Sequence, residues 1–380
     1  MIKAILLDLD NTLLVNPDRR FAQAFLTLFE AYWAEAGMAN AGHKLRQALK
    51  QLSSNQAGNR TNQQIIIEAL GDDTEQVNNT LAQFYRDVYP ALKGCISAMA
   101  GAVDLIEQIQ TATDWALVIA TNPIYPDDAI RQRMAWAGLP SDDERYALIT
   151  SAENMHFAKP DPAYYAEILG RVGVEPDEAL MIGDGLQNDI NPAQAIGIHT
   201  FQIGEAGLKP FVKQFNPEKL STIPAIRLRP HMIEPQLRGN IGAVYGFIET
   251  VQPNFWQQRP DPEEWSILQI LSHLIESEEQ HERQRLLTIL QEDNPFLTQS
   301  EQPGPDLKVY NEDGYALAEA FMRARQETIS LIETFNDTDW RRPARHSIFG
   351  LTTMLEMSYF TAQHDRLHLN QLCHTIGRCE

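Results

Sequence analysis

The order of apolar runs along the first 205 residues constrains the fold of this 380-residue chain more than any other feature. Short runs rich in branched apolar residues alternate there with amphipathic stretches at helical spacing. The apolar runs occupy residues 3–9, 115–120, 147–150, 179–183 and 199–203. A short run that is apolar throughout is typical of a strand buried on both faces, and alternation with helices predicts a parallel sheet covered on both sides. Residues 1–205 are therefore expected to form an α/β domain.

A group of helical stretches separates the first apolar run from the second. Phe21, Phe25, Phe29 and Tyr32 recur at helical spacing, and further periodic stretches follow. The later stretches lie around residues 45–52, 63–70 and 77–88. We expect residues 15–93 to form a small helical insertion after the first strand.

The alternation stops after the fifth apolar run. Residues 206–229 contain scattered prolines and no clean period, so we interpret them as a linker. From residue 230 onward the periodic segments are all helical, with helices expected at 235–251, 266–291, 315–335 and 351–376. Ser266 and Gln269 fit a capping box that opens the second of these helices. Residues 230–380 are therefore predicted to form an all-α four-helix bundle.

The charge of the chain limits its partners. The formal net charge of −20 repels nucleic acid and anionic membrane surfaces, so neither is an expected partner. No apolar run approaches the ~20 residues that span a bilayer, and the N-terminus lacks a signal-peptide pattern. The three cysteines form no CxxC pair, which argues against a disulfide framework and agrees with a cytoplasmic location. Oligomerisation through the helical bundle is left open.

Polar motifs follow four of the apolar runs, at the places where the strands are expected to end. They are DLDNT at residues 8–12, Thr121, Lys159 in AKPDP, and GDGLQND at residues 183–189. Open α/β sheets bind ligands at this edge. One carboxylate can form an aspartyl-phosphate, and a second carboxyl group can protonate the leaving group and then deprotonate water. A lysine and Mg²⁺ can offset the negative charge of the transferring phosphoryl group, and oxygen ligands without histidine favour Mg²⁺.

The four motifs, in this order and at these spacings, resemble those of the haloacid dehalogenase superfamily, over residues 1 to about 205. The resemblance implies a Rossmann-like core with a helical cap formed by the insertion. It also implies that Asp8 is the nucleophile, Asp10 the general acid and base, and Thr121 a ligand of a phosphoryl oxygen.

The same resemblance assigns the charged residues of the later motifs. It implies that Lys159 stabilises the nucleophile and the transferring group. Asp184 would bind Mg²⁺ together with Asp8 and the backbone carbonyl of Asp10, and Asp189 would support this metal site. Asn11 stands where many members have glycine, a departure that affects backbone shape.

Dehalogenation of a 2-haloacid is the alternative reaction that the superfamily suggests. The dehalogenases lack an aspartate two residues after the nucleophile and need no metal, whereas Asp10 and Asp184 are both present here. We therefore expect a Mg²⁺-dependent phosphatase that acts on a small phosphorylated metabolite. Arg19, Arg20 and Arg60 of the insertion could meet an anionic substrate, although exposed arginines on such a surface are usually only solvated.

Three histidines mark a second candidate site in the C-terminal region. His364 and His368 are four residues apart, so they share one face of the expected helix, and His273 borders the apolar stripe of another. Helical bundles build metal sites from inward side chains on facing helices, and three imidazoles with an open position suit Zn²⁺ or Ni²⁺. The remaining histidines considered, His281, His346 and His374, are expected to be structural.

Residues 263–284 and 348–372 carry a resemblance to the DinB/YfiT-like family, which extends over about residues 230–380. It implies a four-helix bundle whose metal is held by His273, His364 and His368. Because neutral imidazole is the ligand form, metal binding is expected to weaken below pH ~6.5. Some members resemble thiol-dependent transferases or metal hydrolases. In the alternative function, the chain is a metal-binding, thiol-transferase or interaction module, and its first half is mainly a scaffold or regulator.

Overall fold

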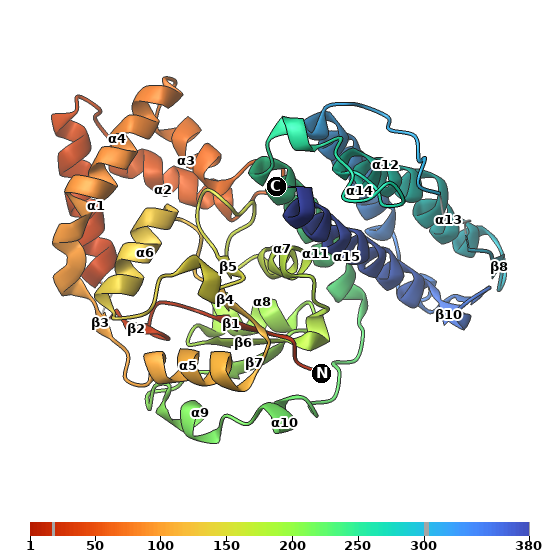
Figure 1. Ribbon diagram of the computed structural model, residues 1–380, viewed down its shortest axis with the longest axis horizontal. Coiled ribbons are helices and arrows are strands. Elements are labelled where there is room, and N and C mark those ends of the chain that lie inside the picture. Colours follow the sequence, from red (N-terminus) through yellow and green to blue (C-terminus); the bar gives the residue numbers. More distant parts are fainter. Residues whose placement is uncertain (17–19, 300–303, 380) are drawn as a thin grey trace. The chain divides into compact units, whose positions relative to one another are not determined.

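The computed structural model describes residues 1–16, 20–299 and 304–379 (Figure 1). The chain divides into two compact units. The first unit contains residues 1–56, 60–164 and 176–226, and the second contains residues 57–59, 165–175 and 227–380.

A parallel sheet of five strands lies at the centre of the first unit, with the order β5-β4-β1-β6-β7. Its strands are β1 (Ala4–Leu7), β4 (Ala116–Ile119), β5 (Leu148–Ile149), β6 (Ala179–Gly183) and β7 (His199–Gln202). Every side chain of β1 and β6 is buried, as the apolar runs predict. The chain leaves β1 toward β4 and leaves β6 toward β7, so a crevice opens between β1 and β6 at their carboxyl ends. The predicted parallel sheet is confirmed.

Helices flank this sheet, and two more form in the segment expected to be a linker. The flanking helices are α5 (Ala102–Ala112), α6 (Asp127–Trp136) and α8 (Asn191–Gln194), whereas most of α7 (Pro162–Val172) belongs to the second unit. After β7 follow α9 (Lys209–Gln214) and α10 (Pro217–Leu220). Phe211 of α9 is buried, with its ring 4.6 Å from that of Phe201, so part of residues 206–229 packs on the first unit.

The helical insertion forms a cap of four helices, which lie together in red and orange in Figure 1. They are α1 (Arg20–Glu35), α2 (Ala41–Leu52), α3 (Asn62–Leu70) and α4 (Thr74–Asp87). A two-stranded antiparallel sheet of β2 (Leu14–Val15) and β3 (Ser97–Ala98) connects the cap to the core. Buried aromatic rings, among them Phe25, Phe29 and Phe84, fill the space between the cap helices. The regularly spaced apolar residues of this segment therefore pack against one another inside the cap.

Long helices dominate the second unit, as predicted for the four-helix bundle. They are α11 (Ile233–Thr250), α12 (Ile267–Ser277), α13 (Arg283–Gln291), α14 (Gly314–Ile332) and α15 (Met354–Cys379). The capping box of Ser266 and Gln269 at the start of α12 is confirmed. α12 and α13 together correspond to the single predicted helix, with one wider turn at Glu278–Glu282 between them.

A small sheet in the second unit was not predicted. It consists of β8 (Phe296–Leu297), β9 (Pro343–His346) and β10 (Gly350–Thr353), in the order β10-β9-β8. The expectation that every periodic segment after residue 230 is helical is therefore wrong here. Leu351 belongs to β10, so the last helix begins at Met354 instead. Strands of two to four residues are too short to show an alternating pattern.

Among the described residues, no helix combines the length with the apolar character that crossing a membrane requires.

Candidate functional site

The expected nucleophile Asp8 lies in the crevice between β1 and β6, in contact with a buried lysine. Lys159 donates from Nζ to Oδ1 of Asp8 over 2.8 Å and to Oδ1 of Asp189 over 2.6 Å. Carboxylate oxygens of Asp8, Asp184 and Asp189 lie within 4.8 Å of one another. The structure thus brings together four of the predicted residues from three separate segments.

The loop after β6 can place Asp189 here because two glycines leave room for its carboxylate. A Cβ on Gly183 would come within 2.5 Å of Oδ2 of Asp189, so a larger residue does not fit. The backbone N–H of Gly185 donates to the same Oδ2 over 2.8 Å. Asp189 is therefore held at one oxygen by the loop and at the other by Lys159. Both Asp189 and Asp8 therefore contact the same ammonium group.

The charges of this site favour a divalent cation. Burial raises the pKa of Asp8 to about 7, with Lys159 acting against it and the charges of Asp189 and Asp10 adding to it. Burial and the charge of Asp189 also raise the pKa of Asp184. Three carboxyl groups share one ammonium group, so a dication among them would offset the remaining repulsion. Hard oxygen donors are the ligands that Mg²⁺ takes, and these residues fit it.

Thr121 follows β4, next to β1 in the sheet, and its backbone is fixed by two hydroxyl groups. Its carbonyl oxygen accepts from Oγ1 of Thr150 and from the hydroxyl of Tyr164, each over 2.8 Å. The ring of Tyr164 also lies 5.9 Å from Nζ of Lys159. Tyr164 thus links two predicted site residues, and no sequence motif singled it out.

The carboxylate of Asp10, the expected general acid and base, contacts an arginine that sequence reasoning missed. Its Oδ1 accepts from Nη2 of Arg133 and from Nδ2 of Asn16, the latter over 2.8 Å. Arg133 lies on α6 and is 1% exposed. One signal could have revealed it: on α6 it shares the buried face with Ile130 and Met134, where a cation needs a partner.

The structure describes two of the three arginines that could meet an anionic substrate. Arg19 lies outside the described residues, and Arg20 is exposed. Arg60 is half-exposed and pairs with Glu68 over 2.6 Å. Both side chains are therefore accessible to solvent on the cap.

The first unit also contains a pocket of about 380 Å³ between the cap helices and the loop after β4. Its walls are mostly apolar and include Phe25, Leu49, Leu81 and Tyr125. Its polar groups include Glu153, whose pKa is raised by burial. A pocket with this lining suits an organic group more than an inorganic ion.

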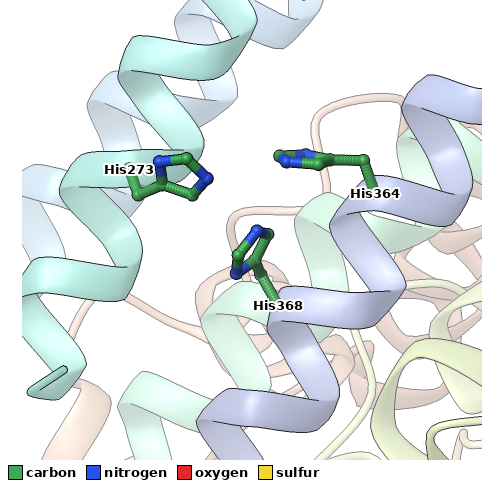
Figure 2. A group of neighbouring side chains, drawn as sticks. All are labelled: His273, His364 and His368. Carbon is green, nitrogen blue, oxygen red and sulfur yellow. The ribbon is translucent and has the colours of Figure 1, made fainter. Parts of the chain in front are cut away.

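The three predicted histidines converge in the second unit, as Figure 2 shows. His273 comes from α12, and His364 and His368 come from α15. One nitrogen from each ring lies within 4.8 Å of the others. Helical spacing predicted the pairing of His364 with His368, and bundle packing supplies the third imidazole.

Neighbouring side chains orient these rings. Nδ1 of His368 lies 2.9 Å from Oε1 of Gln371, and Nε2 of His273 lies 3.3 Å from Oγ of Ser277. The ring of Trp265 stacks on His368 at 5.9 Å. These partners hold the rings facing a common point, as partners of metal-ligating histidines commonly do.

The environment keeps the three rings neutral. Burial, followed by the charges of the neighbouring histidines, lowers the pKa of His273 to about 3. Burial also lowers the pKa of His364 and of His368 to about 4. Neutral imidazole is the form that binds Zn²⁺ or Ni²⁺, so the site fits either metal. Burial disfavours the protonated rings, so these rings gain a proton at a lower pH than the ~6.5 of free imidazole.

The other histidines stay outside this cluster. His346 is buried on β9, where its Nδ1 accepts from the backbone N–H of Ile348 over 3.2 Å. It also lines a pocket of about 560 Å³ that includes the three clustered histidines. His374 is exposed on α15, and His281 is half-buried.

Comparison with known proteins matches both halves of the chain. The sequence model of the haloacid dehalogenase-like hydrolases matches residues 2–197, and that of the DinB superfamily matches residues 236–372. Phosphoserine phosphatase from Thermus thermophilus is 30% identical over 103 residues, which are 27% of this chain and 39% of that protein. Haloacid dehalogenase-like hydrolase domain-containing protein 3 from Bos taurus is 35% identical over 77 residues, 20% of this chain and 31% of that protein. The matches thus span between three and four tenths of these relatives.

Solved structures of the same superfamily align with more than half of the chain. A HAD phosphatase from Thermococcus onnurineus is 20% identical, with 54% of this chain and 88% of that chain covered and a TM-score of 0.33. A 2-haloacid dehalogenase from Pseudomonas syringae is 22% identical, with 53% and 86% covered and a TM-score of 0.38. The family match over residues 2–197, together with the sheet order, shows that this chain belongs to the haloacid dehalogenase-like hydrolases, and its residues 236–372 are similar to the DinB superfamily.

Proposed function

We propose that this protein is a Mg²⁺-dependent phosphatase that hydrolyses a small phosphorylated metabolite through an aspartyl-phosphate on Asp8. The observation that carries the proposal is the contact of Lys159 with both Asp8 and Asp189, beside Asp184. A nucleophilic carboxylate, a cation and a cluster of hard oxygen ligands are what phosphoryl transfer requires.

In the first step Asp8 attacks phosphorus. Lys159 occupies Oδ1 of Asp8, so Oδ2 is the oxygen free to form the new O–P bond. The bond from phosphorus to the leaving oxygen breaks, and Asp10 gives its proton to that oxygen. In the second step Asp10 takes a proton from water, the water oxygen attacks phosphorus, and the Asp8 carboxylate leaves with inorganic phosphate released.

Asp8, Asp184, Asp189 and the backbone carbonyl of Asp10 would hold the magnesium ion. When bound, the ion offsets the charge that gathers on the phosphoryl oxygens. Lys159 adds a second positive charge beside Asp8, and its burial strengthens the effect of that charge on the reacting atoms. The apolar lining of the pocket suits the organic part of a small phosphoester. Its wall residue Tyr125 lies in the same loop after β4 as Thr121, the proposed ligand of the phosphoryl group.

The metal requirement leads to a pH-dependent prediction. The folded pKa of Asp8, about 7, lies above its unfolded value of 3.8, so Asp8 contributes less to stability as pH rises between these values. Mg²⁺ binds the ionised carboxylate, and we expect it to raise the melting temperature more at pH 8 than at pH 6. Thermal unfolding of the full chain with and without Mg²⁺ measures this difference. The shift should be lost in Asp184→Asn, and an equal shift in that variant would place the metal elsewhere.

We also propose that the second unit binds one Zn²⁺ or Ni²⁺ ion through His273, His364 and His368. The convergence of three neutral, oriented imidazoles supports this proposal. The adjoining pocket of about 560 Å³ would give a small molecule access to an open coordination position.

A further inference from the structure

Both donors that reach Asp10 bind the same carboxylate oxygen. Arg133 and Asn16 each donate to Oδ1, and no donor among the described residues reaches Oδ2. An oxygen that already accepts from a guanidinium and an amide has its in-plane lone pairs occupied. Oδ2 is therefore the oxygen of Asp10 that remains available to a reacting group.

The guanidinium of Arg133 is held in place by aromatic rings as well as by Asp10. Its central carbon lies 4.8 Å from the ring centre of Phe21 and 5.5 Å from that of Tyr125. Cations over aromatic faces are attracted to them, and the attraction grows where water is absent. The buried charge of Arg133 is thus placed between two rings and one carboxylate.

The remaining donors of Arg133 make a purely structural role costly. Its Nε and Nη1 are buried and have no hydrogen-bond partner among the described residues. Leaving buried donors unpaired lowers the stability of the fold. An apolar residue on the same face of α6 would avoid this cost, so the arginine contributes mainly through its contact with Asp10.

Arg133 also connects Asp10 to the cap and to the pocket of the first unit. Phe21 lies on α1, the first cap helix, and Tyr125 lies in the loop after β4 and lines the apolar pocket. A change in the position of the cap or in the filling of the pocket would therefore reach the carboxylate of Asp10 through one side chain.

We propose that Arg133 is a positioning residue that holds Asp10 by Oδ1, so that Oδ2 carries the proton exchanged with the leaving group and with water. The inference rests on the proposed phosphatase function and deepens it. In the first step the proton on Oδ2 passes to the oxygen that leaves phosphorus. In the second step Oδ2 takes a proton from the attacking water. Arg133 itself neither gives nor receives a proton.

The leaving group of the substrate provides the test. p-Nitrophenolate leaves readily without a proton, whereas the alkoxide of β-glycerophosphate does not. Without Arg133, the first turnover of β-glycerophosphate by the full chain with Mg²⁺ should slow by ~10²-fold, within the range of general acid catalysis. The burst of p-nitrophenol from p-nitrophenyl phosphate should slow less than ~10-fold, with KM for both substrates nearly unchanged.

Three variants make this comparison specific. Arg133→Met removes the cation, and Arg133→Lys should restore part of the loss because it keeps the charge without the planar fork. Asn16→Ala removes the second donor to Oδ1 and should show a weaker loss with the same substrate preference. Arg131→Met on the same helix is the matched control, because Arg131 pairs with Asp127 and not with Asp10. It should leave the ratio between the two substrates unchanged.

The failure of this inference differs from the failure of the proposed function. If Asp10 is the general acid, Asp10→Asn should lose more activity on β-glycerophosphate than on p-nitrophenyl phosphate. Given that result, equal losses on both substrates in Arg133→Met and Asn16→Ala would overturn the role of Arg133. If Asp10→Asn shows no preference, the acid assignment fails and the inference falls with it.

Melting temperatures of Arg133→Met, Asp10→Asn and the double variant give a measurement that needs no activity. Because the two residues are in contact, their shifts should deviate from additivity by at least ~2 °C. Additive shifts would show that the pair does not form in solution, whatever the kinetics.

Discussion

Replacing Asp8 with asparagine should reduce the hydrolysis of p-nitrophenyl phosphate by on the order of 10³-fold or more. The amide keeps the shape of the side chain but is a poor nucleophile and a weak magnesium ligand. It also cannot be the charged partner that Lys159 has in the wild-type site. Steady-state rates of the full chain in saturating Mg²⁺ measure the loss.

Asp114→Asn is the matched control for this experiment. Asp114 is exposed in the same unit and precedes β4, whereas Thr121 follows that strand. The substitution thus makes the same chemical change at the opposite end of β4 from the crevice. It should retain wild-type activity. Full activity in Asp8→Asn would contradict the proposed nucleophile, and a similar loss in both variants would point to damage of the fold.

Removing one histidine of the second unit should abolish its metal content. Only two imidazoles would remain in His364→Ala. A site of this kind needs three protein ligands and leaves the fourth position open, so two are too few. We expect about one equivalent of Zn²⁺ or Ni²⁺ in the wild-type chain purified without a histidine tag, and close to none in the variant. Elemental analysis measures the content directly.

The exposed His374 on the same helix supplies the control. His374→Ala should keep the wild-type metal content and the increase in melting temperature that a bound metal gives. Because the pKa values of the three rings are lowered to about 3 and 4, the metal should stay bound well below pH 6.5. Equal metal content in wild type and His364→Ala would identify the three histidines as ordinary packed residues.

Periodicity and strand-end motifs were enough to predict the sheet, the cap and the bundle. Each of these features repeats a pattern over many residues: buried strands such as Ala179–Gly183 are apolar throughout, and α12 has a regular apolar face. The crevice residues were predictable for a similar reason. The ends of parallel strands share one edge of a sheet, so the positions of Asp8 and Asp184 follow from topology.

Features that depend on packing between distant segments left little trace in the sequence. Arg133 is one charged residue in a short amphipathic helix, and only the fold shows that it reaches Asp10 from α6. Tyr164 and Gln371 likewise act through partners that no spacing rule specifies. The strands β8 to β10 were missed because runs of two to four residues are too short to show a strand pattern. Their pairing with one another, which the sequence does not reveal, stabilises them.

The position of β1 in the middle of the sheet has a consequence for the newly made chain. Ala4 pairs with Ala116 of β4 on one side and with Ala179 of β6 on the other. β1 therefore cannot complete its pairing until β6 has been translated. The cap helices are local in sequence and are complete before that neighbour exists. A nascent chain that has not reached β6 contains Asp8 but neither Asp184 nor Asp189. During synthesis, therefore, the proposed nucleophile is made long before the residues that would bind magnesium beside it.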